Sequence, residues 1–287
     1  MRTLLIAGAV AFTAFSVAPS YAACALNQNE RPTGRNTRNP AVIEDLLGRA
    51  QTSLSGGDVA GACAKFNLVL AIDPNNNTAR LGLGEGALKE TDFTAAAAHF
   101  ESIIAREETN AAAHQGLGLA RALGGDFTAA EPSLRRAVEL DNSLWRSWNT
   151  LGVIADSRGD WTSADAAYDS ALAAAPNEAN LHNNRGLSLM RRGEARAAVA
   201  EFDIALRLSP RFETAESNRR IALAMTGQYD AALAGVSDAE MPVALNNVAV
   251  VAGRRGDRVV ADRLLAAAIT ASPRYYELAA RNRDAFR

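Results

Sequence analysis

Small and apolar residues return at regular intervals along most of the chain. Residues 159–176 read GDWTSADAAYDSALAAAP, where apolar and alanine positions recur with helical spacing and the segment closes on a proline. Segments of the same form lie at 91–100, 124–134, 192–202 and 255–265. Each predicts a turn followed by an amphipathic helix.

The spacing of these segments is 34 residues, and three sets of positions fall into register at that step. They are Gly57, Thr91, Gly125, Gly159, Gly193 and Gly227; Ala62, Ala96, Ala130, Ala164, Ala198 and Ala232; and Pro74, Glu108, Asn142, Pro176 and Pro210. The register predicts repeats that begin near Ile43, Asn77, Ala111, Trp145, Ala179, Glu213 and, after a sixth repeat that is five residues short, Pro242.

The fourth repeat shows why each position needs its residue type. Gly152 and Ala164 are small, so two antiparallel helices can approach closely, while large side chains such as Tyr168 fill the space between them. Gly159 can adopt the left-handed conformation that ends the first helix, and Asp160 can cap the second. The pattern resembles the tetratricopeptide repeat. The resemblance implies an all-α, right-handed superhelical solenoid of about seven helix-turn-helix repeats over residues 43–287, with a closing helix at 274–287.

The N-terminus has the features of an export signal. Arg2 precedes an apolar stretch from Leu4 to Val17, which small residues follow. The stretch is shorter than the roughly 20 residues that a membrane-spanning helix needs. We therefore expect residues 1–23 to be a signal peptide, and the mature protein to be exported and periplasmic, either as a soluble protein or as an outer-membrane lipoprotein.

Processing after this signal has two alternative outcomes. SYA at 20–22 fits ordinary signal peptidase, whereas YAAC at 21–24 resembles a bacterial lipobox with tyrosine where leucine is usual, so that Cys24 would be lipidated. An unmodified Cys24 can instead form a disulfide with Cys63 in an oxidising compartment. Residues 24–42 are polar and interrupted by proline and glycine, which predicts a flexible tether.

Charge and motifs indicate a binding protein rather than an enzyme. The net charge is −2, but residues 43–178 carry 10 basic against 19 acidic side chains and residues 179–287 carry 16 against 12. This balance gives no support for nucleic acid as a partner. No nucleotide-binding, hydrolase or zinc-protease motif occurs, and we expect no cofactor and no metal. His99 and His114 keep an enzyme as a remote alternative, and His114 and His182 occupy the position of Trp148, which favours a structural role.

Amide side chains mark the first helices of several repeats. A row of carboxamides can donate to and accept from the backbone of an extended peptide, as in the asparagine ladders of some peptide-binding relatives. The alternative is that these amides bond to neighbouring helix ends. Arginines at other first-helix positions can add contacts to carboxylates. The predicted peptide-binding residues are Asn149, Asn183, Asn184, Asn218, Asn246, Asn247, Arg146, Arg191 and Arg254.

A narrower resemblance rests on residues 183–235 and 245–277. These segments resemble the tetratricopeptide lipoprotein of tight-adherence (Flp) pilus assembly. That resemblance implies a non-catalytic scaffold of the bacterial envelope, with a secretin or another pilus component as partner. The alternative is a soluble periplasmic adaptor in cell-wall or polysaccharide assembly. The partner and the oligomeric state stay open at this stage.

Overall fold

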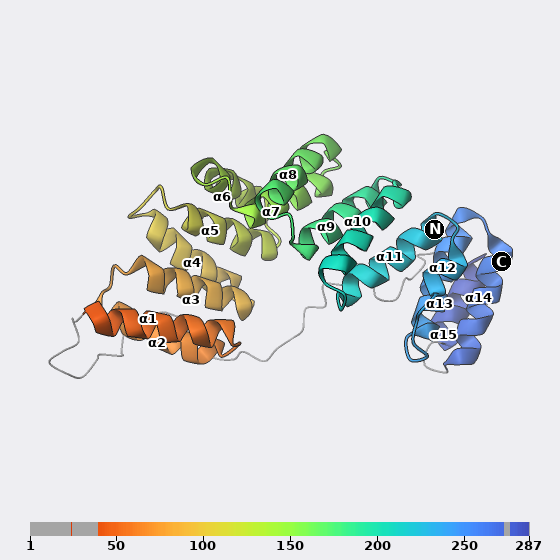
Figure 1. Cartoon of the computed structure of the whole chain (residues 1–287), viewed down its shortest axis with the longest axis horizontal. Coiled ribbons are helices and arrows are strands. Elements are labelled where there is room, and N and C mark those ends of the chain that lie inside the picture. The colour runs from red at the N-terminus through yellow and green to blue at the C-terminus, as the bar shows by residue number, and fades with distance from the viewer. Residues whose placement is uncertain (1–23, 25–39, 273–275, 287) are drawn as a thin grey trace. The chain divides into compact units, whose positions relative to one another are not determined.

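The computed structural model describes Cys24, residues 40–272 and residues 276–286, and every regular element in these parts of the chain is an α-helix. The helices form two compact units, which we call the N-terminal unit (Cys24 and residues 40–176) and the C-terminal unit (residues 177–272 and 276–286) (Figure 1). The all-helical fold built from helix pairs is confirmed. The predicted signal peptide, and the predicted tether apart from Cys24 and residues 40–42, lie outside the described residues.

The N-terminal unit contains eight of the helices. They are α1 (Pro40–Ser55), α2 (Val59–Ile72), α3 (Asn77–Lys89), α4 (Phe93–Ile104), α5 (Ala111–Leu123), α6 (Phe127–Leu140), α7 (Trp145–Ser157) and α8 (Trp161–Ala174). The first one begins at Pro40, earlier than Ile43, because proline is favoured in the first turn of a helix.

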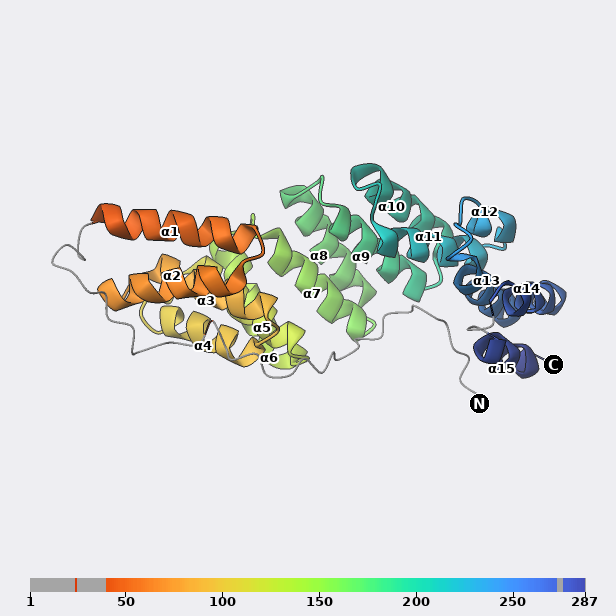
Figure 2. The same ribbon diagram turned by 90° about the horizontal axis from the view of Figure 1, so that it is seen from below.

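The C-terminal unit contains the other seven described helices. They are α9 (Ala179–Arg191), α10 (Ala195–Leu208), α11 (Glu213–Met225), α12 (Tyr229–Leu233), α13 (Met241–Arg255), α14 (Arg258–Ala271) and α15 (Tyr276–Phe286). The last of these packs against α14, as expected for a closing helix (Figure 2).

Within each unit the helices pack as successive pairs, and the first helices of neighbouring pairs also contact one another. The turn inside each pair has one residue in the left-handed conformation, at the position that the register aligns. This residue is glycine in six pairs, for example Gly159 with φ +72°, and Thr91 with φ +60° in the pair α3–α4. The repeat therefore imposes the backbone conformation even where the side chain disfavours it.

The core between paired helices is built from glycines facing rings. A Cβ added to Gly84 would lie 2.5 Å from the ring of Phe100, and one added to Gly152 would lie 2.8 Å from the ring of Tyr168. Gly186 and Phe202 repeat the contact in the C-terminal unit, at 2.6 Å. Only glycine permits this approach, so a close-packed glycine and a large side chain from the second helix define a regular repeat.

Cys24 is part of the core of the N-terminal unit. It is 1% exposed and forms a disulfide with Cys63 of α2, and its carbonyl oxygen lies 2.9 Å from Nε2 of His99 in α4. A Cβ on Gly86 of α3 would meet both sulfur atoms, at 2.6 and 2.7 Å. Of the alternatives for Cys24, the structure contains the disulfide.

Candidate functional site

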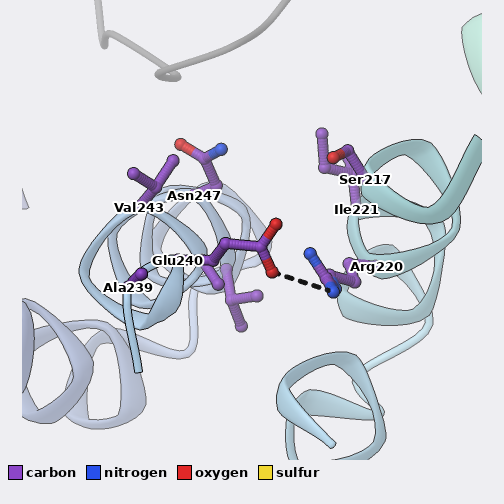
Figure 3. A pocket seen from close by; sticks show the side chains of 9 residues that line it. Ser217, Arg220, Ile221, Ala239, Glu240, Val243 and Asn247 are labelled. Atoms are coloured by element: carbon purple, nitrogen blue, oxygen red, sulfur yellow. Dashed lines mark ion pairs between the residues drawn. The ribbon is translucent and has the colours of Figure 1, made fainter. Parts of the chain in front are cut away.

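A pocket of about 210 Å³ opens between α11 and α13 in the C-terminal unit (Figure 3). Ser217 and Ile221 of α11 line one side, and Val243 and Asn247 of α13 line the other. Further lining residues are Arg220, Ala239, Glu240, Ala244 and Val248. The pocket therefore combines an apolar surface with hydroxyl, amide and charged groups, as binding sites generally do.

The charges of the pocket centre on Arg220. Its side chain is 13% exposed and makes an ion pair with Glu216, one turn earlier in α11. Glu240, just before α13, lies 3.7 Å from the same guanidinium group and is 55% exposed. Figure 3 shows this pair spanning the space between the two helices. One partly buried cation is thus shared by two carboxylates from different elements.

The pocket arises where the repeat period fails. Along the chain, Gly84, Gly118, Gly152 and Gly186 stand 34 residues apart, and the next residue in this series is Arg220. The second helix that would cover this position is α12, which has only five residues instead of the 14 of α10. Because the short helix supplies no ring at this place, a long side chain can replace glycine.

Most of the predicted asparagines in the C-terminal unit bond to one another. Asn218 donates to Oδ1 of Asn183 at 2.9 Å between α11 and α9. Asn183 in turn lies 3.4 Å from Oδ1 of Asn184. The same arrangement recurs between α13 and α15, where Asn282 donates to Oδ1 of Asn246 at 2.9 Å and Asn246 lies 3.3 Å from Oδ1 of Asn247.

Burial separates these asparagines into two groups. Asn183, Asn218 and Asn246 are buried, and their carboxamides join first helices of neighbouring pairs. At these three positions the carboxamides are occupied by bonds between amide side chains of different helices, neither exposed as an open ladder nor bonded to helix ends in these contacts. Asn184 and Asn247 are half-buried, and Asn247 lines the pocket. Peptide contact stays a prediction for them.

The other predicted site residues lie apart from the pocket. Asn149 is half-buried on α7 of the N-terminal unit. Arg146, on the same helix, is exposed and lies 5.2 Å from the ring centroid of Trp145. Arg191 and Arg254 are exposed in the last turns of α9 and α13. None of these three arginines lines the pocket.

The histidines bond to backbone or carboxylate groups. Nε2 of His114 lies 2.8 Å from the carbonyl oxygen of Glu108, and the indole N–H of Trp148 makes the equivalent bond to Asn142 one repeat later. Nδ1 of His182 lies 2.8 Å from Glu201. Within the described parts of the chain no cluster of His, Cys, Asp or Glu side chains could hold a metal ion. The structural role expected for His114 and His182 fits these contacts.

The family comparison agrees with the geometry. A family model described as tetratricopeptide repeat matches residues 81–144 and 149–211. The all-helical structure built from helix pairs has the tetratricopeptide-repeat fold. No curated protein sequence matches it significantly.

Several solved structures resemble this chain in fold. PilF of Pseudomonas aeruginosa has a TM-score of 0.58 and 16% identity, and the match covers 67% of this chain and 87% of PilF. PilW, described as a widely conserved type IV pilus biogenesis factor, has a TM-score of 0.61 and 18% identity, covering 68% and 90% of the two chains. A chain of the APC/C hetero-tetramer Cut9–Hcn1 has a TM-score of 0.62 and 17% identity, covering 85% of this chain and 52% of that one. At these identities the likeness shows the fold alone.

Sequence reasoning missed the two charged residues that define the pocket. Arg220 was detectable, because it breaks a series of glycines in the tetratricopeptide register. Glu240 carried no such signal, because it lies in the irregular segment between α12 and α13. The five-residue deficit of the sixth repeat was the one feature that pointed to this place.

Proposed function

We propose that the protein is a non-catalytic scaffold of the bacterial cell envelope that binds an extended segment of a partner protein and supports pilus or secretion-system assembly. The tetratricopeptide fold is a scaffold for protein–protein interaction, and the pocket between α11 and α13 is the observation that carries the proposal. A stacked helical array is ordered before binding, so it loses little conformational entropy when a segment docks.

Two further observations support a role in the envelope. The first 23 residues have the pattern of an export signal, and a disulfide such as Cys24–Cys63 is typical of proteins that fold in oxidising compartments. PilF and PilW, whose folds resemble this one, are pilus proteins, and the tight-adherence resemblance suggests the same kind of partner. A secretin or an Flp pilus component is the partner that we propose.

The disulfide also bears on how the protein is held in the envelope. The Sγ atom of Cys24 cannot be in a disulfide and in the thioether of a lipidated cysteine at once. In the described part of the chain no helix is long and apolar enough to span a membrane. The disulfide favours a released protein over one anchored through Cys24. A released protein also agrees with the second candidate function, a periplasmic adaptor in cell-wall or polysaccharide assembly.

The test is photo-crosslinking in living cells, with a photoreactive amino acid placed at a residue that lines the pocket. A photoreactive amino acid at Val243, which lines the pocket, is compared with the same residue at Ala267, which is exposed on α14. We expect a discrete envelope partner to be captured from Val243 only, and mass spectrometry identifies it. A pilus or secretion component supports the first function and a cell-wall protein the second. Equal capture at both positions, or none, contradicts the proposal.

A further inference from the structure

Three charged side chains meet at the pocket between α11 and α13, in an otherwise basic unit. Arg220 and Glu240 line the pocket, and Glu216, which lies outside the lining, also pairs with Arg220, so that this group has one cation against two carboxylates. The surrounding segment 179–287 has 16 basic against 12 acidic residues. The local sign is therefore opposite to that of the unit, and it favours a cationic group in the pocket.

The two carboxylates are not equally engaged. Glu216 pairs with Arg220 across one helical turn, in direct contact. Glu240 lies 3.7 Å from Arg220, beyond hydrogen-bond distance, and its side chain is 55% exposed. Its oxygen atoms can accept hydrogen bonds from an incoming ammonium or guanidinium group while Arg220 stays paired with Glu216.

An aliphatic surface lies beside this carboxylate. Ile221, Val243 and Val248 line the pocket together with Ala244, and Ser217 and Asn247 add a hydroxyl and an amide that can bond to a peptide backbone. Figure 3 shows Val243 and Ile221 on opposite sides of the opening, with Glu240 between the two helices. An aliphatic side chain of a partner can thus be buried within reach of Glu240.

We infer that the pocket binds a partner segment in which an aliphatic residue is adjacent to a lysine or arginine, whose cation pairs with Glu240. The inference rests on the proposed function and specifies the class of segment that the scaffold recognises. The aliphatic side chain contributes through burial of apolar surface, and the cation supplies specificity.

The test uses the full mature chain with isotope-labelled isoleucine and valine methyl groups, observed by NMR. The probes are three nine-residue peptides in a glycine–serine frame, with Leu-Arg, Leu-Glu or Ser-Arg at the centre. We expect the Leu-Arg peptide to shift the methyl signals of Ile221, Val243 and Val248, and the other two to bind at least tenfold more weakly. Equal binding of Leu-Arg and Leu-Glu, or shifts confined to other methyl groups, would overturn the inference.

Two variants of one loop provide the matched comparison. Glu240→Gln should raise the dissociation constant of the Leu-Arg peptide about tenfold, because it removes one charge pair in a partly desolvated site. Asp238→Asn removes the same charge two residues away, at an exposed position outside the pocket, and should leave binding unchanged. An equal effect of both variants would mean that only the general charge matters and would refute the specific role of Glu240.

The crosslinking experiment separates this inference from the function on which it rests. If Val243 captures the same partner with equal yield in the Glu240→Arg background, the scaffold function stands and the cationic ligand class is wrong. If the wild-type protein captures no partner from Val243, the proposed function itself fails. Loss of capture only in the Glu240→Arg background supports both.

Discussion

The two units start their helices in different ways. In the N-terminal unit the side chain of an Asp or Asn caps six helices by accepting from a backbone N–H, at Asp58, Asn76, Asp92, Asn110, Asp126 and Asp160. In the C-terminal unit no side-chain cap bond is present at helices α9 to α14. Each such cap stabilises a helix by about 1 kcal/mol.

The units also differ in how they use polar groups inside. Both units contain the glycine-and-ring contacts of regular repeats, and the N-terminal unit is also closed by a disulfide. The C-terminal unit has asparagine pairs between α9 and α11 and between α13 and α15. It also has Arg220 at the position that glycine occupies in the preceding repeats. Local sequence signals therefore specify the first unit more strongly, and the second departs from them where the pocket lies, as expected of a functional region.

The largest expected effect comes from the disulfide. Replacing Cys24 by Ala should lower the free energy of unfolding by about 4 kcal/mol, because the bond closes a chain segment with a sequence separation of 39. Hydrogen exchange measured by mass spectrometry should show faster exchange in α2, α3 and α4. Unchanged protection in these helices, or an equal loss in α13 and α14, would contradict the assignment of Cys24 to the N-terminal core.

The buried asparagine pairs should matter next. Asn246→Ala removes the acceptor of the Asn282 amide in the protein interior, and we expect a loss of about 2 kcal/mol in denaturant unfolding. The exposed Asn180 serves as the control, and Asn180→Ala should change stability by less than about 0.5 kcal/mol. A double-mutant cycle with Asn282→Ala that gives no coupling would show that the pair does not stabilise the unit.

Adding a cap should make the second unit more like the first. Glu194 stands in the series of Asp58, Asp92, Asp126 and Asp160, but its longer side chain makes no cap bond. Glu194→Asp should stabilise α10 by about 1 kcal/mol. The reverse change, Asp160→Glu, should destabilise α8 by a similar amount, and opposite signs in the two thermal melts are the decisive result.

A smaller gain is expected from Thr91. It is the one non-glycine residue described with a positive φ, and glycine adopts this conformation without strain. Thr91→Gly should raise the free energy of unfolding by up to about 1 kcal/mol. Ser53→Gly, inside α1, is the control and should be destabilising, because glycine is unfavourable within helices. A loss at both positions would contradict the account of the turn.

The smallest effect concerns pH. Burial lowers the pKa of His99, with Arg80 acting in the same direction, while its hydrogen bond to Cys24 and the charge of Asp92 act in the opposite one. The unfolded chain therefore takes up a proton at a higher pH than the folded one. Stability should fall as the pH drops below the ordinary histidine pKa of about 6.5. His99→Gln should reduce this slope, and an unchanged slope would exclude His99 as its source.

The fold was predictable because regularly spaced glycine and alanine residues reveal both the 34-residue period and the register of the repeats. Gly159 and Asp160 adopt the turn and cap expected of them. The candidate site was less accessible. The sequence places asparagines on the right helices, but whether position 183 faces the interior depends on how neighbouring pairs pack, which the periodicity does not specify. Arg220 and Glu240 meet only because α12 is short and the following segment returns toward α11.

We expect partner binding to be concentrated where the repeat period breaks, at the pocket between α11 and α13. The most direct measurement places one photoreactive amino acid in turn at equivalent first-helix positions of different repeats, at Ala112 in the N-terminal unit and at Val243 in the pocket, and compares capture in living cells. We predict that a discrete partner is captured from Val243 and little or none from Ala112. Equal capture at both positions, or capture from Ala112 alone, would contradict it.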